Sequence, residues 1–390
     1  MAKPSGITRA TARRITIPPY PEFRTPYALT YFYRSLIEKK TGRSVSYLTV
    51  PPRSLHSTVE IPMTSVPPLT ETPAAPLPRL TTTVPKEYVH RASLAEVFLT
   101  GCTKQSETHF ELTGQWPRAH TFFHDVNGKD HDPLLVAETF RQTGLFLAHA
   151  ELGVPLGHHF VMWDLTFTTQ LPHLRIGSAP TDIGLTAICT DVSRRGRTTS
   201  GFRMELALRR SSQVIATGGG RFTCIAPAVY RRLRGSRLGS TGTVPPQPAG
   251  DVLPPSAVGR LRPSDVVLSA THLPNRWLLL PDPNHPVLFD HAGDHLPGMV
   301  LLEAARQAAG QCVAPGTMLP SAMSTVFHRY AELDEPCWIE AALAPSQEGG
   351  GITVEVTGRQ GGHQVFSSTV TGPRPLALTT RRIRVADAET

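Results

Sequence analysis

The chain has 390 residues, of which 40 % are hydrophobic and 18 % are charged, which predicts two or three domains with a sizeable core. No apolar run approaches the length that crosses a bilayer, so we expect no membrane partner. The formal net charge is +8, but residues 1–84 hold eleven Lys and Arg against four Asp and Glu, which leaves only +1 for the rest. A near-neutral body argues against nucleic-acid binding.

The five cysteines are far apart in the sequence, and no Cys-x-x-Cys pair occurs. This spacing indicates neither a disulfide framework nor a zinc site. We therefore expect buried thiols, a cytoplasmic location in which thiols stay reduced, no metal and no cofactor.

Residues 1–84 are rich in Pro, Ser, Thr and Arg, and repeated Pro-Pro pairs interrupt any long periodic element. We predict a mostly disordered extension with one short helix near residues 27–40. A basic, acid-poor start is also typical of an organelle transit peptide, whereas a secretory signal is not indicated.

Order is expected from Pro85. Strands are predicted over residues 89–100 and 108–116, followed by a helix over residues 134–152 that starts after Pro133 and ends at Gly153. Strands then follow over residues 160–169, 183–192, 202–209 and 213–225. Within the last of them, the three glycines at 218–220 indicate a bulge or a close approach of another strand. The first domain is predicted to span residues 85–230.

A Pro-, Gly- and Ser-rich linker is expected over residues 231–256, after which the pattern repeats. The run Ser264–Ser269 echoes Ala95–Thr100, and a short strand is predicted over residues 277–280. A helix over residues 299–312 and strands over residues 322–330, 337–344, 351–357 and 364–371 complete the second copy. The second domain is predicted to span residues 257–376, with a C-terminal tail over residues 377–390.

Both predicted helices carry a Glu and an Arg three residues apart, namely Glu138/Arg141 and Glu303/Arg306. Such charges share one helix face, and burying them is costly unless they are paired or used. The two glutamates are 165 residues apart, which is too long for a solenoid repeat and fits two copies of one domain. One helix among antiparallel strands is an α+β arrangement. We predict a tandem (double) hotdog, in which two sheets, each wrapped around a central helix, can pair edge to edge.

The second helix and the residues before it, Asp294–Gln307, resemble the signature of the A-factor biosynthesis (AfsA-type) hotdog family. The first half matches that family at Val89–Ser93, at Glu96-Val97 and over Asp130–Gln142, so the resemblance covers about residues 85–375. It implies an acyltransferase of γ-butyrolactone autoregulator biosynthesis. The implied reaction moves a β-ketoacyl group from an acyl carrier protein thioester, or a coenzyme A thioester, to the hydroxyl of dihydroxyacetone phosphate. The ester then cyclises to a butenolide phosphate.

That chemistry needs a base, donors for the thioester oxyanion and a positive site for phosphate. Glu138 and Glu303 are candidate bases, because burial on an apolar helix raises a carboxyl pKa. Backbone N–H groups at either helix start can bind the carbonyl oxygen. We predict catalytic roles for Glu303, Arg306 and Glu138, and substrate-binding roles for Arg141, Gly298 and His295. The second copy is favoured because only it has the Pro297-Gly298 helix entry.

Several alternatives stay open. Both Glu/Arg pairs can be structural i,i+3 ion pairs, and His295 can be a cap, a turn residue or an acid. The aspartates at positions 130, 132 and 294 are interpreted as helix caps. The helix motif also resembles that of hotdog dehydratases, but their catalytic His, eight residues before the Pro, is replaced here by Phe289. A thioesterase and a non-catalytic acyl- or lactone-binding module are further candidates. The basic runs Arg194–Arg197 and Arg231–Arg234 are either carrier-protein docking surfaces or solvated loops.

Overall fold

The computed structural model describes residues 80–239, 251–314, 318–345 and 351–374. Nearly all of the predicted N-terminal extension, including the helix expected near residues 27–40, and the predicted C-terminal tail lie outside these residues. Within the described part, all strands belong to one 12-stranded sheet in the order β1-β2-β4-β5-β6-β3-β9-β12-β11-β10-β8-β7. Every pairing in it is antiparallel.

The first half contributes six strands and a long helix. These elements are β1 (Leu99–Lys104), β2 (His109–Trp116), α2 (Leu134–Ala150), β3 (His159–Thr169), β4 (Thr181–Arg195), β5 (Thr198–Arg210) and β6 (Gln213–Ile225). A short helix, α3 (Pro227–Arg234), follows and crosses the boundary predicted between the first domain and the linker. The predicted domain limits therefore stay a prediction.

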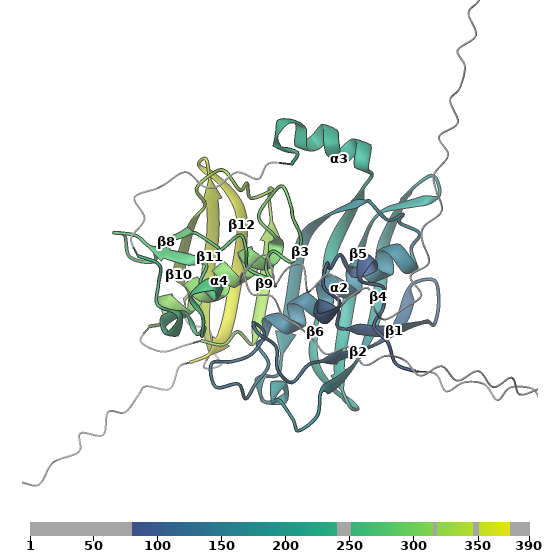
Figure 1. Ribbon diagram of the computed structural model, residues 1–390, viewed down its shortest axis with the longest axis horizontal. Coiled ribbons are helices and arrows are strands. Elements are labelled where there is room, and N and C mark those ends of the chain that lie inside the picture. The colour runs from purple at the N-terminus through teal and green to yellow at the C-terminus, as the bar shows by residue number, and fades with distance from the viewer. Residues whose placement is uncertain (1–79, 240–250, 315–317, 346–350, 375–390) are drawn as a thin grey trace, which may run out of the picture. The chain divides into compact units, whose positions relative to one another are not determined.

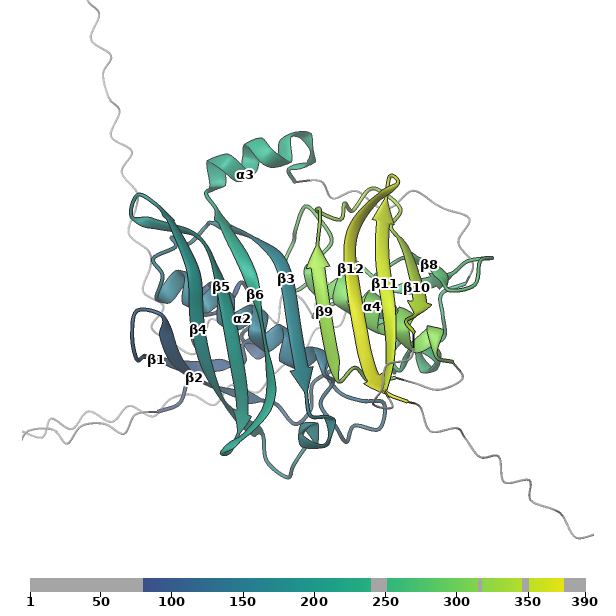
Figure 2. The same cartoon turned by 180° about the vertical axis from the view of Figure 1, so that it is seen from behind.

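The second half repeats this order of strands and helix. Its elements are β7 (Leu268–Ala270), β8 (Arg276–Leu279), α4 (Gly298–Cys312), β9 (Ala322–Phe327), β10 (Trp338–Leu343), β11 (Gly351–Gln360) and β12 (His363–Pro373). Helices α2 and α4 lie on the same face of the sheet, as the two opposite views show (Figures 1 and 2). The tandem hotdog prediction is confirmed.

The two sheets join edge to edge where β3 pairs with β9, from Asp164 opposite Val326 to Thr168 opposite Ala322. This seam makes within one chain the continuous sheet that the sequence predicted. Because both helices pack on one side of that sheet, the space between them lies between the two halves.

The strand predicted over residues 89–100 is wrong over most of its length. Short 3-10 helices occupy Lys86–Val89 and Leu94–Glu96, and β1 begins only at Leu99. The reason is that local groups accept from the backbone donors: the Arg91 N–H donates to the Lys86 carbonyl at 3.0 Å, and the Ser93 hydroxyl accepts from the Ala95 N–H. The predicted echo nonetheless holds, since a 3-10 helix at Pro263–Asp265 precedes β7 in the same way.

At the three glycines 218–220, neighbouring strands approach β6 closely. Of the two predicted alternatives, a bulge or a close approach, the second is correct. The register between β5 and β6 is unbroken there, so no bulge is present. A Cβ on Gly218 or Gly219 would lie 2.1 Å from the carbonyl oxygen of Thr166 or 2.0 Å from that of Met204, respectively. Only glycine lets the neighbouring strands come this close.

We therefore expect Gly219→Ala to destabilise the protein by about 3 kcal/mol or more, because backbone rather than a flexible side chain must move. Urea denaturation at neutral pH measures the effect. Gly310→Ala is the matched control, since a Cβ on this helical glycine meets nothing within 4 Å. It should be neutral or stabilise by up to about 1 kcal/mol through helix propensity. Equal midpoints for the two variants would contradict the close approach.

Candidate active site

Each central helix carries a fully buried glutamate that is held by two arginines and a glutamine. Glu303 accepts hydrogen bonds from Arg260 Nε at 2.8 Å, Arg306 Nε at 2.9 Å and Gln307 Nε2 at 2.6 Å. Glu138 repeats the arrangement with Arg91 Nε at 3.1 Å, Arg141 Nε at 2.8 Å and Gln142 Nε2 at 2.8 Å. The i,i+3 ion pairs considered from the sequence are present, and each gains a second arginine that precedes the glutamate by more than forty residues.

The expectation that burial raises the pKa of these glutamates is wrong. Burial does favour the neutral form, but Arg260 and Arg306 outweigh it and lower the pKa of Glu303 to about 2. Arg141 and Arg91 likewise lower the pKa of Glu138 to about 2. Both side chains are therefore ionised at neutral pH, with their oxygens already occupied.

The same clusters link the two halves reciprocally. Arg91 Nη1, from the first half, donates to the Val287 carbonyl at 3.1 Å and lies 4.0 Å from the Asp290 carboxylate. Arg260 Nη1, from the second half, donates to the Phe122 carbonyl at 2.8 Å and lies 3.0 Å from Asp132. The relative position of the halves is thus fixed by buried charge pairs that neither half can satisfy alone.

We expect Glu303→Gln to destabilise the protein by about 3–5 kcal/mol at pH 7, because two buried guanidinium groups lose their carboxylate. The folded-state pKa of about 2 lies below the usual 4.5, so the carboxylate stabilises the fold above pH 4.5 and that contribution is lost as the pH falls toward 2.

Urea denaturation between pH 2.5 and 7 should therefore show the difference between wild type and variant shrinking below pH 4.5. Glu340→Gln is the control, since its pairs with Arg276 and Arg359 are half-exposed. Its cost should stay under about 1 kcal/mol. A pH-independent difference for Glu303→Gln would contradict the lowered pKa.

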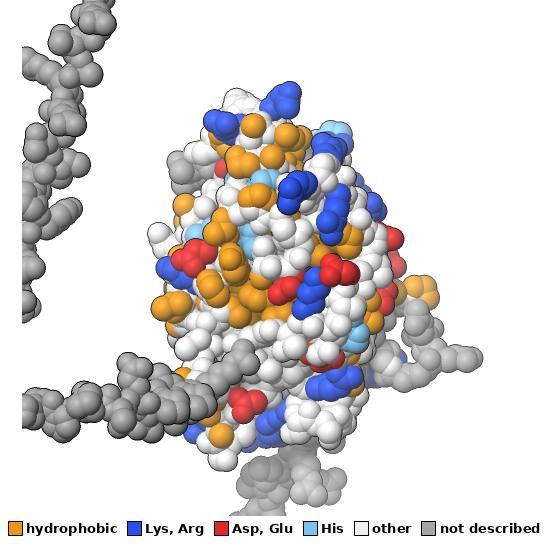
Figure 3. Space-filling model, turned by 90° about the vertical axis from the view of Figure 1, so that its right-hand side faces the viewer, with side chains coloured by type: hydrophobic (Ala, Val, Ile, Leu, Met, Phe, Trp, Pro, Cys, Tyr) orange, Lys and Arg blue, Asp and Glu red, His pale blue; other side chains and the backbone are white. Residues whose placement is uncertain are grey.

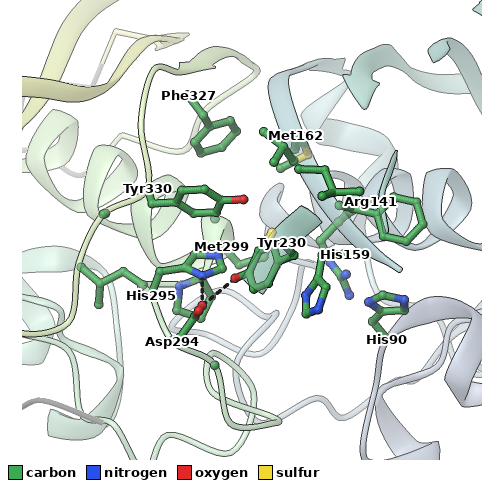
Figure 4. Close-up of a pocket in the computed structure, with 18 of the residues that line it drawn as sticks. His90, Arg141, His159, Met162, Tyr230, Asp294, His295, Met299, Phe327 and Tyr330 are labelled. Carbon is green, nitrogen blue, oxygen red and sulfur yellow. Dashed lines mark hydrogen bonds and ion pairs between the residues drawn. The ribbon is translucent and has the colours of Figure 1, made fainter. Parts of the chain in front are cut away.

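A cavity of about 1000 Å³ lies between the halves. Its apolar wall includes Leu145, Phe160, Met162, Met299 and Phe327, contributed by α2, β3, α4 and β9 (Figure 4). Such a volume with a mainly apolar wall and a few polar groups is typical of a small-molecule site. Elsewhere, on the surface shown in Figure 3, acidic, basic and hydrophobic side chains are interspersed, in keeping with the near-neutral body.

The structure brings three of the predicted site residues to the cavity wall. Arg141, His295 and Gly298 line it, whereas Glu138, Glu303 and Arg306 do not. The Arg141 side chain keeps 16 % of its surface exposed, against 3 % for Arg306 and none for either glutamate. The predicted catalytic roles of Glu138, Glu303 and Arg306 stay a prediction, and their geometry places them behind the wall.

His295 forms a pair with the residue before it. Its Nδ1 lies 2.8 Å from Asp294 Oδ1. Burial opposes ionisation of Asp294, but hydrogen bonds from His295, Tyr230 and Arg234 lower its pKa to about 2. A carboxylate can only accept, so His295 Nδ1 is the donor. Burial lowers the pKa of His295 more than Asp294 raises it, so the ring is neutral, and its Nε2 has no hydrogen-bond partner within the described ranges. Asp294 is therefore no helix cap.

On the wall opposite His295, His90 forms a hydrogen-bonded pair with His149. The sequence interpretation missed this pair. His149 Nδ1 donates to the Val154 carbonyl at 2.8 Å, so its Nε2 accepts from His90 Nε2 at 2.9 Å. Burial and the neighbouring Arg141 lower the pKa of His90 to about 3. His90 lines the cavity as a neutral ring, and its Nδ1 is an acceptor.

The two helix starts differ. At α2, Asp132 Oδ1 accepts from the Leu134 N–H at 2.8 Å, which confirms the predicted cap. At α4, Pro297 supplies no side-chain cap, and Gly298 and Met299 line the cavity. The Val300 N–H donates to the Pro297 carbonyl at 3.0 Å, whereas the Gly298 and Met299 N–H groups have no hydrogen-bond partner in the described part of the chain, so these two amides are left for a ligand. The Tyr330 hydroxyl, a further buried donor on this wall, has no hydrogen-bond partner among the described residues.

No group of three or more His, Cys, Asp or Glu within the described ranges is placed to hold a metal ion. Nucleophilic Ser or Cys side chains are likewise absent from the cavity lining. The wall instead presents neutral imidazole acceptors, free helix amides, a phenol and guanidinium groups. This combination can remove a proton from an alcohol and stabilise an oxyanion.

The family model of the A-factor biosynthesis hotdog domain (AfsA) matches residues 73–226 and 243–373. The chain belongs to this family. It is 53 % identical over 293 residues to a 2-oxo-3-(phosphooxy)propyl 3-oxoalkanoate synthase of Streptomyces virginiae, covering 75 % of this chain and 98 % of the relative. The synthases of the same name from Streptomyces coelicolor and Streptomyces griseus are each 40 % identical, over 74 % of this chain and 91 % and 95 % of theirs.

Little in the sequence indicated the other residues that line the cavity. His90 and Arg91 lie in a stretch that matches the family, but nothing in their spacing assigned them a role. His159, which also lines the cavity, begins β3. Tyr230 and Tyr330 reach the cavity through tertiary packing that no local pattern encodes.

Proposed function

We propose that this chain is a 2-oxo-3-(phosphooxy)propyl 3-oxoalkanoate synthase, which transfers a β-ketoacyl group from a thioester to a hydroxyl of dihydroxyacetone phosphate in γ-butyrolactone biosynthesis. The observation that carries the proposal is the cavity itself. It places a neutral His295 with a free Nε2, the uncapped start of α4 and the Arg141 guanidinium around one apolar space. The names of the AfsA relatives support the same reaction.

In the proposed mechanism, His295 Nε2 accepts the proton of the acceptor hydroxyl as its oxygen attacks the thioester carbonyl carbon. Asp294 keeps the Nδ1 proton in place and stabilises the imidazolium that forms. The oxyanion accepts hydrogen bonds from the first amides of α4 and from the Tyr330 hydroxyl. Collapse breaks the C–S bond, the thiolate takes the proton from His295, and the ester and a free thiol leave.

The phosphate of the acceptor is assigned to arginines on the cavity wall. Arg141 Nε and Nη2 bind Glu138, and Nη2 also donates to the Val89 carbonyl, so Nη1 remains for a ligand. Arg329 also lines the cavity, is exposed, and forms no ion pair within the described residues. Together they supply the positive site that a phosphate dianion needs.

We propose an acyl carrier protein as the donor and the cytoplasm as the location. Arg231 and Arg232 are exposed on α3, beside cavity-lining Leu233, where a carrier could dock. Arg234 of the same basic run is buried and paired, so it does not contribute. The five cysteines are free thiols, which fits a reducing compartment. No helix within the described residues is long and apolar enough to cross a membrane.

Purified protein should form the acyl ester from a β-ketoacyl thioester only when dihydroxyacetone phosphate is present, as followed by mass spectrometry. A carrier-bound donor should be used more efficiently than its coenzyme A analogue. His295→Ala should lower kcat by roughly 10²–10⁴-fold because the base is lost. His363→Ala, at an exposed position of β12, is the control and should retain full activity.

Three outcomes would contradict this reading and identify a rival. Release of water indicates a dehydratase, and release of free acid without any dependence on the acceptor indicates a thioesterase. Tight acyl or lactone binding without turnover indicates a binding module.

Arg329→Gln and Arg141→Gln should each raise KM for dihydroxyacetone phosphate by about tenfold or more, because a charged hydrogen bond to phosphate is lost. Unphosphorylated dihydroxyacetone, tested at high concentration, should show no such difference between wild type and Arg329→Gln. Arg329→Gln leaves the Glu138 cluster intact and therefore separates phosphate binding from stability. An equal rise in KM for both acceptors would contradict the assignment of these arginines to the phosphate site.

A further inference from the structure

Helix α3 sends two side chains, one helical turn apart, from the end of the first half into the second. Tyr230 is 4 % exposed and Arg234 is 6 % exposed, although their neighbours Arg231, Arg232 and Leu233 face solvent. In Figure 1, α3 stands beyond the end of the sheet. Figure 4 shows Tyr230 reaching Asp294 beside His295.

Both side chains end on Asp294. The Tyr230 hydroxyl donates to Asp294 Oδ1 at 2.7 Å, and Arg234 Nε donates to Oδ2 at 3.0 Å. Arg234 Nη2 also donates to the Asp294 carbonyl oxygen at 2.8 Å. All three oxygens of Asp294 are thus held by α3, while Oδ1 also accepts from His295 Nδ1.

Further contacts hold Tyr230 and Arg234, the two α3 side chains that we call the latch. The Tyr230 ring stacks on His159 at 3.6 Å with an interplanar angle of 5°. Arg234 pairs with Glu332 at 2.7 Å and lies over the Tyr330 ring, 4.6 Å from its centroid. A helix of eight residues is not stable by itself, so these contacts set its position.

We propose that Tyr230 and Arg234 are positioning residues for the acyl transfer, which hold Asp294 so that His295 presents its free Nε2 to the cavity. The inference rests on the proposed function for the identity of the reaction, but the geometry of the latch is independent of it. Its consequence is that the base contributed by the second half is oriented by a helix of the first.

The groups facing His295 determine how the latch affects its titration. They are Asp294 beside it, Tyr230 and Arg234 from α3, His159 from β3, and Tyr330 and Glu332 after β9. Removing the Tyr230 hydroxyl leaves the Asp294 carboxylate with one donor fewer, so it attracts the proton on His295 more strongly. Removing the Arg234 charge removes a repulsion. Both changes raise the pKa of His295.

The test compares the pH dependence of kcat/KM for the full-length wild type, Tyr230→Phe and Arg234→Gln. The acid limb should move to higher pH by roughly half a unit in Tyr230→Phe and further in Arg234→Gln. We expect kcat to fall by about threefold to tenfold in Tyr230→Phe and by about 10–100-fold in Arg234→Gln, with smaller changes in KM. Arg359→Gln is the control, because Arg359 is half-exposed and pairs with Glu340 rather than with Asp294 or Glu332, and its profile should match the wild type.

A loss of kcat with an unmoved acid limb would reduce both residues to structural supports and overturn the inference. Tyr230→Phe keeps the ring that stacks on His159, so it remains informative where Arg234→Gln does not fold. If wild type turns over no substrate, the proposed function fails, and nitrogen NMR of His295 tests the latch separately. An Nδ1-protonated ring whose pKa rises in Tyr230→Phe supports it, and an identical titration in the two proteins overturns it.

Discussion

The structure depends on a buried carboxylate shared by two guanidinium groups, formed once in each half. Removing a single partner from such a cluster leaves an uncompensated charge in the interior. An incomplete cluster therefore has a high free-energy cost. One arginine comes from the helix and the other from the segment before β1 or β7. Arg91 also reaches Val287 and Arg260 also reaches Phe122, so an arginine of each cluster contacts the other half. The cavity lies between the halves that these contacts join.

Duplication explains why the two clusters have the same set of partners, and divergence explains why, of these two helix starts, that of α4 lines the cavity. Gln142 binds the Phe98 N–H and Gln307 binds the Val267 N–H in the same way. The difference lies at the helix entries, where Asp132 caps α2 but Pro297 leaves α4 uncapped. The proposed site therefore combines the uncapped helix start of the second half with the arginine-bearing wall of the first.

The sequence allowed the repeat, the tandem hotdog and the central helices to be predicted, since these follow from hydrophobic periodicity and from a motif that occurs twice. It did not allow the partners of Glu138 and Glu303 to be predicted, because Arg91 and Arg260 approach only after folding. The sign of the pKa shift was missed for the same reason: desolvation can be read from a helix face, but the opposing charges cannot. Arg141, His295 and Gly298, which were predicted from residue type and position, line the cavity, whereas the cavity positions of His90, Tyr230 and Tyr330 depend on long-range packing.

The placement of the proposed base follows from these constraints. A glutamate held by two arginines and a glutamine has a pKa of about 2 and does not line the cavity, so it is a poor base at neutral pH. A neutral imidazole with one nitrogen fixed by Asp294 keeps the other available in the range where histidine works. Within the motif Asp294–Gln307, the helical residues Glu303 and Arg306 belong to the buried cluster, and the proposed base His295 lies before the helix, at the cavity wall. The buried clusters hold the backbone on both sides of His295: Arg91 binds the Val287 carbonyl before it, and Glu303 binds its arginines after it.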